Sequence, residues 1–232
     1  VLDDSRSRQL VAEMMILAGE VAARYGRENE LAIPFRSQPQ PELPPDEELL
    51  LLPTGWVRDS AIRRCMTRSE VSITPSRHAT LGLDSYSQVT SPIRRYTDLL
   101  AHFQLKAHLR GEPLPFSSAE VTELAQGASS GSYEATLVER QTKRYWALEY
   151  LRRHRNNIWD VMLLRWLRED SGLGLIMIEE LGLELAMRFE RAVDLGDRLQ
   201  VRVSHANPRQ DIIRFQEVVT DDESSTAVVA AG

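Results

Sequence analysis

The chain has 232 residues, of which 42% are apolar and 27% are charged, enough apolar material for one large or two modest domains. Its formal charge of −6 excludes an overall basic field for nucleic acid, so any contact with RNA has to come from local clusters of Lys and Arg. The single cysteine, Cys65, excludes an internal disulfide framework and a cysteine-based zinc site, and it fits a reducing compartment.

The first predicted element is an amphipathic helix over residues 8–25, where apolar residues keep the 3.6-residue period and Gly26 follows as a stop. A connection with five prolines covers residues 34–45, and this proline content excludes a helix or a central strand. Two short helices are expected next, at residues 49–52 and 57–68.

A longer helix is predicted over residues 92–110, because Ser91 can cap it and Pro92 suits the first helical position. Arg94 and Arg95 then fall in its first turn, where basic side chains oppose the helix dipole. Free backbone N–H groups beside two guanidinium groups would form a receptor for a phosphate.

Polar residues recur on the same face of this helix. Asp98 and His102 follow Arg95 at three and seven positions, a stripe that could hold the arginine in place. For His102 itself we expect a packed, hydrogen-bonded histidine rather than a general base.

Further along, Ser117 and Glu120 have the spacing of a capping box that opens another helix. The glycines and serines of residues 127–131 are expected to break that helix. A separate long helix is then predicted from residue 133 to about residue 153.

After residue 156 the pattern changes from helical periodicity to strands. Turn residues separate five strand-like segments, at residues 158–167, 173–178, 183–189, 198–204 and 211–218. The last two resemble the closing strands of an OB-fold of the ribosomal RNA-binding type, and five short strands suit so small a barrel. The fold class is therefore α+β: a helical domain (residues 1–155), an OB-fold barrel (156–219) and a disordered tail (220–232).

Local basic clusters do exist in this acidic chain, although such runs are more often a solvated face than a binding site. They are Arg63-Arg64 with Arg68, Arg94-Arg95, Lys143-Arg144, and the run from Arg152 to Arg155.

The string Thr90-Ser-Pro-Ile-Arg-Arg-Tyr96, with Tyr86 before it and Asp98 and His102 after it, resembles the signature of the ribonuclease II (RNB) family. The resemblance extends diffusely over residues 5–218. It implies a processive 3′→5′ exoribonuclease that releases nucleoside 5′-monophosphates from single-stranded RNA. It also implies Arg94 as the catalytic contact to the scissile phosphate, with Arg95 supporting it or binding a neighbouring phosphate.

The same resemblance implies two substrate-binding acids, Glu13 in the first helix and Glu139 in the long helix, which would contact ribose hydroxyls of the terminal nucleotides. From spacing alone, both could equally be surface carboxylates paired with Lys or Arg one turn away. Three positions depart from the family pattern, since Gly19 replaces Asn, Gln38 replaces His and Phe103 replaces Arg. We make no catalytic claim for Gln38.

The family's four clustered aspartates, which hold Mg²⁺ or Mn²⁺, are not found in this sequence, so no metal ligand is predicted in it. Asp3-Asp4 lacks partners at a suitable spacing, and the acids of residues 221–223 lie in the tail. Since Val1 replaces an initiator Met, we expect a piece of a longer polypeptide that is inactive alone.

The partners expected from these patterns are single-stranded RNA and the upstream half of the same catalytic domain, with neither DNA nor a membrane. The location expected is cytoplasmic. Two alternatives stay open: a non-catalytic single-stranded RNA-binding module, and a scaffold without an RNA role. With Leu175, Ile176, Met177 and Met187 where stacking rings might stand, the barrel should bind RNA weakly and mainly through charge.

Overall fold

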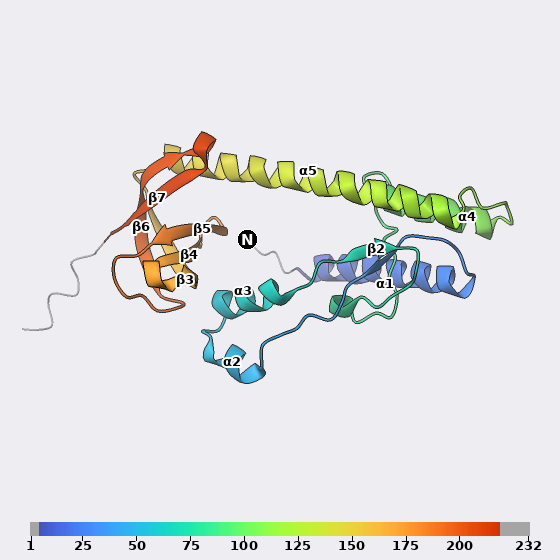
Figure 1. Ribbon diagram of the computed structural model, residues 1–232, viewed down its shortest axis with the longest axis horizontal. Helices are drawn as coiled ribbons and strands as arrows, with labels where there is room; N and C mark the ends of the chain where they lie inside the picture. Colours follow the sequence, from blue (N-terminus) through green and yellow to red (C-terminus); the bar gives the residue numbers. More distant parts are fainter. Residues whose placement is uncertain (1–4, 219–232) are drawn as a thin grey trace, which may run out of the picture. The chain divides into compact units, whose positions relative to one another are not determined.

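The structure, a computed structural model, describes residues 5–218. It has the α+β class expected, with helices followed by a five-stranded antiparallel sheet (Figure 1). The chain forms two compact units: residues up to 42 with 65–137, and residues 43–64 with those from 138 onward. The division predicted from the sequence, at residues 155 and 219, stays a prediction, because compact units group contacts and do not delimit domains. The predicted disordered tail and the acids of residues 3–4 and 221–223 lie outside the described residues.

The first unit is built on helices. It contains α1 (Arg6–Glu28), α4 (Tyr96–Leu109) and the first part of α5 (Ser118–Arg153), with a small ribbon of β1 (Phe35–Ser37) and β2 (Glu70–Ser72) and a 3₁₀ turn at Ala79–Leu81. The prolines of residues 34–45 did not prevent β1, because this two-stranded ribbon pairs only three residues of each strand, and none of the three in β1 is proline. Its core is small and combines α1, β1 and α4; the buried residues are Ala23, Leu31, Ile33, Phe35 and Ala101.

Helix α5 runs unbroken through residues 127–131, so the predicted break was wrong. Within it, Ser129 Oγ donates to the carbonyl of Ala125 one turn earlier, at 2.8 Å, a bond that is compatible with a helical backbone. Its start is as predicted. Glu120 accepts hydrogen bonds from the Ser117 backbone N–H and hydroxyl at 2.8 and 2.7 Å, which confirms the capping box.

The second unit contains the predicted strands. They are β3 (Ile158–Arg168), β4 (Leu173–Ile178), β5 (Leu183–Arg188), β6 (Arg198–Asn207) and β7 (Ile212–Glu217). The order β5-β4-β3-β6-β7 is antiparallel throughout, and the edge strands β5 and β7 also touch, as in a small barrel of OB type. Alternate residues fill its interior, among them Trp159, Val161, Ile176, Ile178, Leu185, Val201 and Val203.

A segment from much earlier in the chain covers part of this barrel. Helices α2 (Asp46–Leu51) and α3 (Trp56–Cys65) belong to the second unit. Val57 is 2% exposed and packs on the outer side of the barrel against Leu164 and Met177. Arg63 adds an ion pair to Glu184 of β5 at 3.5 Å. The segment therefore forms a second, smaller apolar layer outside strands β3 and β4.

Helix α1 leaves one apolar stripe uncovered. Leu10, Met14, Leu17 and Val21 follow one another at helical spacing, and each is between 45% and 64% exposed. Isolated apolar side chains on a surface are normal, but a continuous stripe of this kind marks an interaction surface. We call these four residues the α1 stripe. Among residues 5–218, no helix is long and apolar enough to cross a membrane.

Gly19 is where α1 meets the signature stretch, and it accounts for one departure from the family pattern. The Ser87 N–H donates to the Gly19 carbonyl at 3.2 Å. A Cβ at this position would overlap the ring of Tyr86 and come within 2.8 Å of the Ser87 carbonyl oxygen. Only glycine allows the loop to approach the helix so closely.

Gly19→Ala should therefore lower the free energy of unfolding by about 1–3 kcal/mol, since overpacking outweighs the helix propensity gained with alanine. Gly127→Ala is the matched control, because nothing lies within 4 Å of a Cβ there and alanine should stabilise α5. Urea unfolding followed by circular dichroism measures both. Equal effects of the two substitutions would contradict the close packing of α1 on Tyr86.

Candidate functional site

The two signature arginines lie on a turn that precedes α4, not in its first helical turn. The helix begins at Tyr96, and residues 92–94 form a tight turn in which the Arg94 and Arg95 N–H groups donate to the Ser91 carbonyl at 3.2 and 3.0 Å. These two N–H groups are thus already used, which corrects the predicted receptor of free amides. Pro92 suits this turn, because its ring fixes φ near the value that the second residue of a turn adopts and its missing N–H needs no partner there.

Asp98 holds this turn together. Its side chain is fully buried, and Oδ2 accepts the Ser91 backbone N–H at 2.9 Å and the Arg95 Nε and Nη2 at 3.1 and 2.7 Å. A charge-assisted pair with two guanidinium contacts fixes direction as well as distance. Arg95 also donates to the Thr90 hydroxyl at 3.2 Å. The polar stripe read from the sequence therefore does fix an arginine, and that arginine is Arg95.

Arg94 is in the opposite situation. It is exposed, and within residues 5–218 no hydrogen bond or ion pair engages its side chain. The neighbouring Arg95 is anchored on both sides of the turn, so the backbone that carries Arg94 is held while its guanidinium is free. Such a group can donate two parallel N–H bonds to an oxyanion.

A buried polar layer carries the loop that leads to this turn. Arg36 of β1 donates to Ser69 Oγ at 2.9 Å and to Gln88 Oε1 at 2.8 Å, and its N–H donates to the Tyr86 carbonyl at 2.8 Å. Burial lowers the pKa of Arg36, and the nearby Arg95 guanidinium lowers that pKa further. Sequence reasoning missed Arg36 as part of the site, because its partners lie 33 and 52 residues away in the chain.

His78 lies against the same layer. Its ring meets that of Tyr86 edge to face, with centroids 5.6 Å apart, and burial together with the Arg36 charge lowers the pKa of His78. Gln38, which stands where the family has His, donates through Nε2 to the Thr67 carbonyl at 2.7 Å. Gln38 therefore ties β1 to the loop after α3, in agreement with the absence of a catalytic claim.

The two predicted acids are both exposed. Glu13 lies on α1, where no ion pair engages it in the described part of the chain. Glu139 belongs to the other compact unit and pairs with Lys143 one turn later, at 2.6 Å. The hydrogen bond and charge of Lys143 lower the pKa of Glu139. Glu139 is thus a surface carboxylate paired with a lysine one turn away, as the spacing alone allowed. The RNA contacts predicted for both acids stay predictions.

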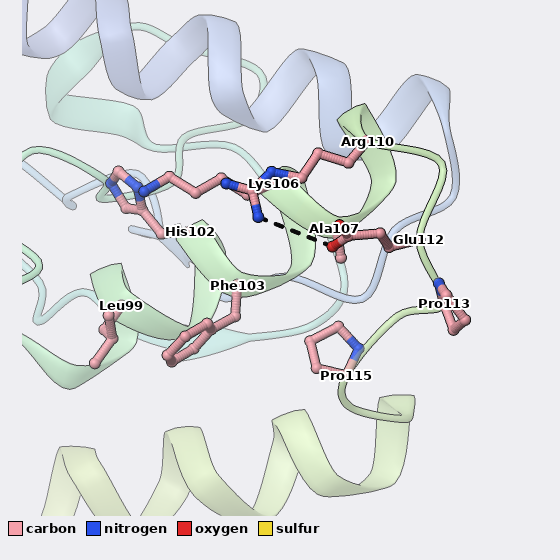
Figure 2. A pocket seen from close by; sticks show the side chains of 9 residues that line it. All are labelled: Leu99, His102, Phe103, Lys106, Ala107, Arg110, Glu112, Pro113 and Pro115. Carbon is pink, nitrogen blue, oxygen red and sulfur yellow. Dashed lines mark ion pairs between the residues drawn. The ribbon is translucent and has the colours of Figure 1, made fainter.

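Figure 2 shows a pocket beside α4, with a volume of about 400 Å³. His102, Lys106 and Arg110 follow one another along one side of the helix, and Phe103 lies on another side, toward the prolines that lead to α5. His102 is tied by a 2.7 Å hydrogen bond between Nε2 and the Val89 carbonyl, which confirms the packed histidine expected from the sequence. Arg94 does not line this pocket, so the pocket is not the predicted phosphate site.

Among the residues that the structure describes, no three His, Cys, Asp or Glu side chains lie close enough to hold a metal ion. Divalent Mg²⁺ and Mn²⁺ need several oxygen ligands in a compact shell. Asp98 does not supply one, because its Oδ2 is fully engaged and its Oδ1 is buried. The residues present therefore do not fit the metal that the sequence resemblance implies.

Comparison with known proteins shows which family contains this arrangement of residues. The profile of the RNB domain matches residues 56–111, which contain the turn with both arginines. A protein named as an uncharacterised ribonuclease of Synechocystis sp. is 65% identical over 95% of this chain, and the chain spans 33% of that relative. This chain belongs to the ribonuclease II (RNB) family.

A further relative and two solved structures match most of the chain. The chloroplastic and mitochondrial ribonuclease II of Arabidopsis thaliana is 37% identical over 91% of this chain and 26% of its own length. The structure of Mycoplasma genitalium RNase R in complex with ribose-methylated single-stranded RNA matches with a TM-score of 0.77 at 18% identity, over 94% of this chain and 42% of that one. Yeast Ssd1, described as a pseudonuclease, matches with a TM-score of 0.63 at 16% identity, over 88% and 28%. The chain thus spans between 26% and 42% of the length of these four proteins.

Proposed function

We propose that this chain is the C-terminal portion of a 3′→5′ exoribonuclease that processively hydrolyses single-stranded RNA to nucleoside 5′-monophosphates. The observation that carries the proposal is the exposed, unengaged Arg94 on a turn that Arg95 and Asp98 hold rigid. The names of the relatives, ribonuclease and ribonuclease II, support the reaction class.

In this proposal Arg94 contacts the scissile phosphate. A guanidinium that already points away from its own fold can meet negative charge as it develops on the phosphoryl oxygens, with little reorganisation. Arg95 is not free to move with the substrate, because Asp98 and Thr90 hold it. Its role is to support the turn and to add positive charge near the phosphate.

Glu13 and Glu139 would accept hydrogen bonds from ribose hydroxyls and so favour RNA over DNA. The Glu139–Lys143 pair is exposed on both sides, and such pairs are worth little in water. Glu139 can therefore leave Lys143 for a ribose at small cost.

The metal would come with another segment. Mg²⁺ or Mn²⁺ polarises the phosphate and supplies hydroxide when bound, but its ligands are not among the described residues of this chain. We propose that they belong to the upstream half of the catalytic domain, and that this half docks on the α1 stripe. Covering these apolar side chains is favourable by roughly 25 cal/mol for each Å² removed from water.

Mixing the two halves tests the proposal. The chain alone should release no nucleotides from a labelled 20-nucleotide RNA, and the complete protein should release 5′-monophosphates in a Mg²⁺-dependent manner. Adding a separately produced upstream half to the chain should restore activity. Met14→Glu, in the α1 stripe, should prevent restoration, whereas Arg24→Ala changes the charge equally on an exposed α1 position and should not. Full activity of the isolated chain, or none in the complete protein, would reject the proposal.

The second candidate is a non-catalytic single-stranded RNA-binding module, which the shared fold with the pseudonuclease Ssd1 keeps open. It predicts that the complete protein binds the same RNA with Mg²⁺ or Mn²⁺ present and releases no nucleotide. We also propose a cytoplasmic location, which imaging of the tagged complete protein would check.

A further inference from the structure

We infer that the barrel grips the RNA backbone through a basic surface on β6 and β7, beside the end of α5, and not through the β4–β5 face that OB-folds commonly use. We call this surface the β6–β7 basic patch and define it as Arg155, Arg202, His205 and Arg214. The inference rests on the proposed function, because it adds a holding site for the substrate of that reaction.

Strand register brings these side chains to one face. On β6, Leu199, Val201 and Val203 are buried in the barrel, so the alternating Arg202 faces outward. An irregularity in the pairing after Val203 then sets His205 opposite Arg214 of β7, and both are exposed. Arg155, at the turn between α5 and β3, lines a pocket of about 170 Å³ together with residues 203–206. This space is several times the roughly 30 Å³ share of one water molecule.

The charges of the patch are uncompensated. Among residues 5–218, no ion pair or side-chain hydrogen bond engages Arg155, Arg202 or Arg214. The neighbouring Arg152 and Arg153 differ, because both are tied to Glu149 at 2.7 and 2.8 Å.

Two acids near these strands pair with arginines outside the patch: Glu217 of β7 with Arg191, and Asp211 before β7 with Arg144. Asp160 of β3 accepts from the neutral Gln200 amide at 3.1 Å and keeps its charge. In a chain with a net charge of −6, three free arginines on one small surface form a local attraction for phosphate.

The opposite side of the barrel lacks the aromatic rings that base stacking needs. OB-folds commonly bind oligonucleotides across strands 2 and 3, which are β4 and β5 here. The outward residues of β4 are Leu175 and Met177, and Met177 is only 3% exposed because Val57 of α3 lies on it. The outward residues of β5, Glu184, Ala186 and Arg188, are exposed but carry no aromatic ring, so neither strand offers a ring on that face for a base to stack on.

The ligand of the patch is thus a single-stranded RNA backbone, recognised by phosphate charge without base readout. Each phosphate contact with a single strand adds about 0.7 to the slope of log Kobs against log salt concentration. Losing two arginines should then reduce the steepness of that slope by about 1.4.

The test uses the complete protein and a fluorescent 20-nucleotide oligo(U), with binding followed by anisotropy in EDTA from about 50 to 300 mM salt. Arg202→Ala with Arg214→Ala should raise Kd roughly tenfold at the lowest salt and flatten the salt slope. Arg168→Ala with Arg188→Ala is the matched control, since it removes two exposed arginines from the β4–β5 side. Its Kd should stay within about twofold. Both double variants alter exposed side chains only, and their melting curves verify folding.

The outcomes separate the inference from the proposed function. A larger loss in the Arg168/Arg188 variant than in the Arg202/Arg214 variant would overturn the inference in favour of the β4–β5 face. Equal Kd values for all three proteins would also overturn it. If RNA is still degraded in Mg²⁺ in either case, the proposed function stands without the patch. If the unaltered protein neither binds nor degrades RNA, both fail.

Discussion

Arg94→Ala in the complete protein should lower kcat for RNA degradation by roughly 10²–10³-fold, while Kd for the same RNA in EDTA changes far less. In the proposed function Arg94 is one phosphate contact among several along the strand, so its removal should subtract little from binding. At the scissile phosphate, however, a preorganised guanidinium opposes charge that develops only as the bond breaks. Single-turnover release of labelled 5′-monophosphate measures the effect.

Two further substitutions sharpen this result. Arg94→Lys keeps the charge but loses the two-pronged geometry, so it should recover only part of the rate. Arg77→Ala removes an exposed arginine from the same compact unit and should leave kcat within about twofold. Should Arg77→Ala and Arg94→Ala slow the enzyme equally, the effect is one of net charge and Arg94 has no specific role.

Asp98→Asn should lower both stability and rate. Asparagine still fills the space, but it leaves Arg95 without its counter-charge and weakens the hydrogen bond from the Ser91 N–H. Because Asp98 is buried while Arg95 is one quarter exposed, we expect a loss of about 2–4 kcal/mol in the free energy of unfolding. Urea unfolding measures it.

The rate effect separates positioning from mere stability. If Asp98 positions the turn that carries Arg94, the folded Asp98→Asn protein should lose kcat with KM nearly unchanged. A double-mutant cycle with Arg95→Met should show that the two losses are strongly non-additive. Normal kcat in folded Asp98→Asn, with additive losses, would reduce Asp98 to a stability residue.

Much of the fold is readable locally. The capping box of Ser117 and Glu120 and the five strands were predicted correctly, because each depends on residues close in sequence. The predicted break at residues 127–131 failed for a physical reason: two glycines cost about 1 kcal/mol each relative to alanine, and the long helix on both sides of them continues through so small a penalty. Gly19 was seen only as a departure, since its partner Tyr86 lies far along the chain.

The site divides in the same way. The motif predicted that Asp98 could hold an arginine, which the structure confirms for Arg95, while the roles of Arg94 and Arg95 toward phosphate stay predictions. It misplaced the helix start, because Arg95, held by Asp98, has an extended backbone (φ −125°, ψ 113°) that a continuous helix through residues 92–96 does not allow. The supporting layer under the loop, with Arg36 and Gln88 paired across 52 residues, has no local signal at all.

The layer that α2 and α3 place on the barrel has a practical consequence for dissecting this protein. An excised 156–219 fragment would contain every strand of the barrel, β3 to β7, but would lack Val57, which covers Leu164 and Met177. Without Val57, the fragment would expose an apolar patch on the side where related barrels stack bases. Such a patch would favour self-association of the fragment or artificial binding of oligonucleotides. A fragment that keeps the native surface of the barrel therefore needs residues 43–64, either added as a separate peptide or fused to it.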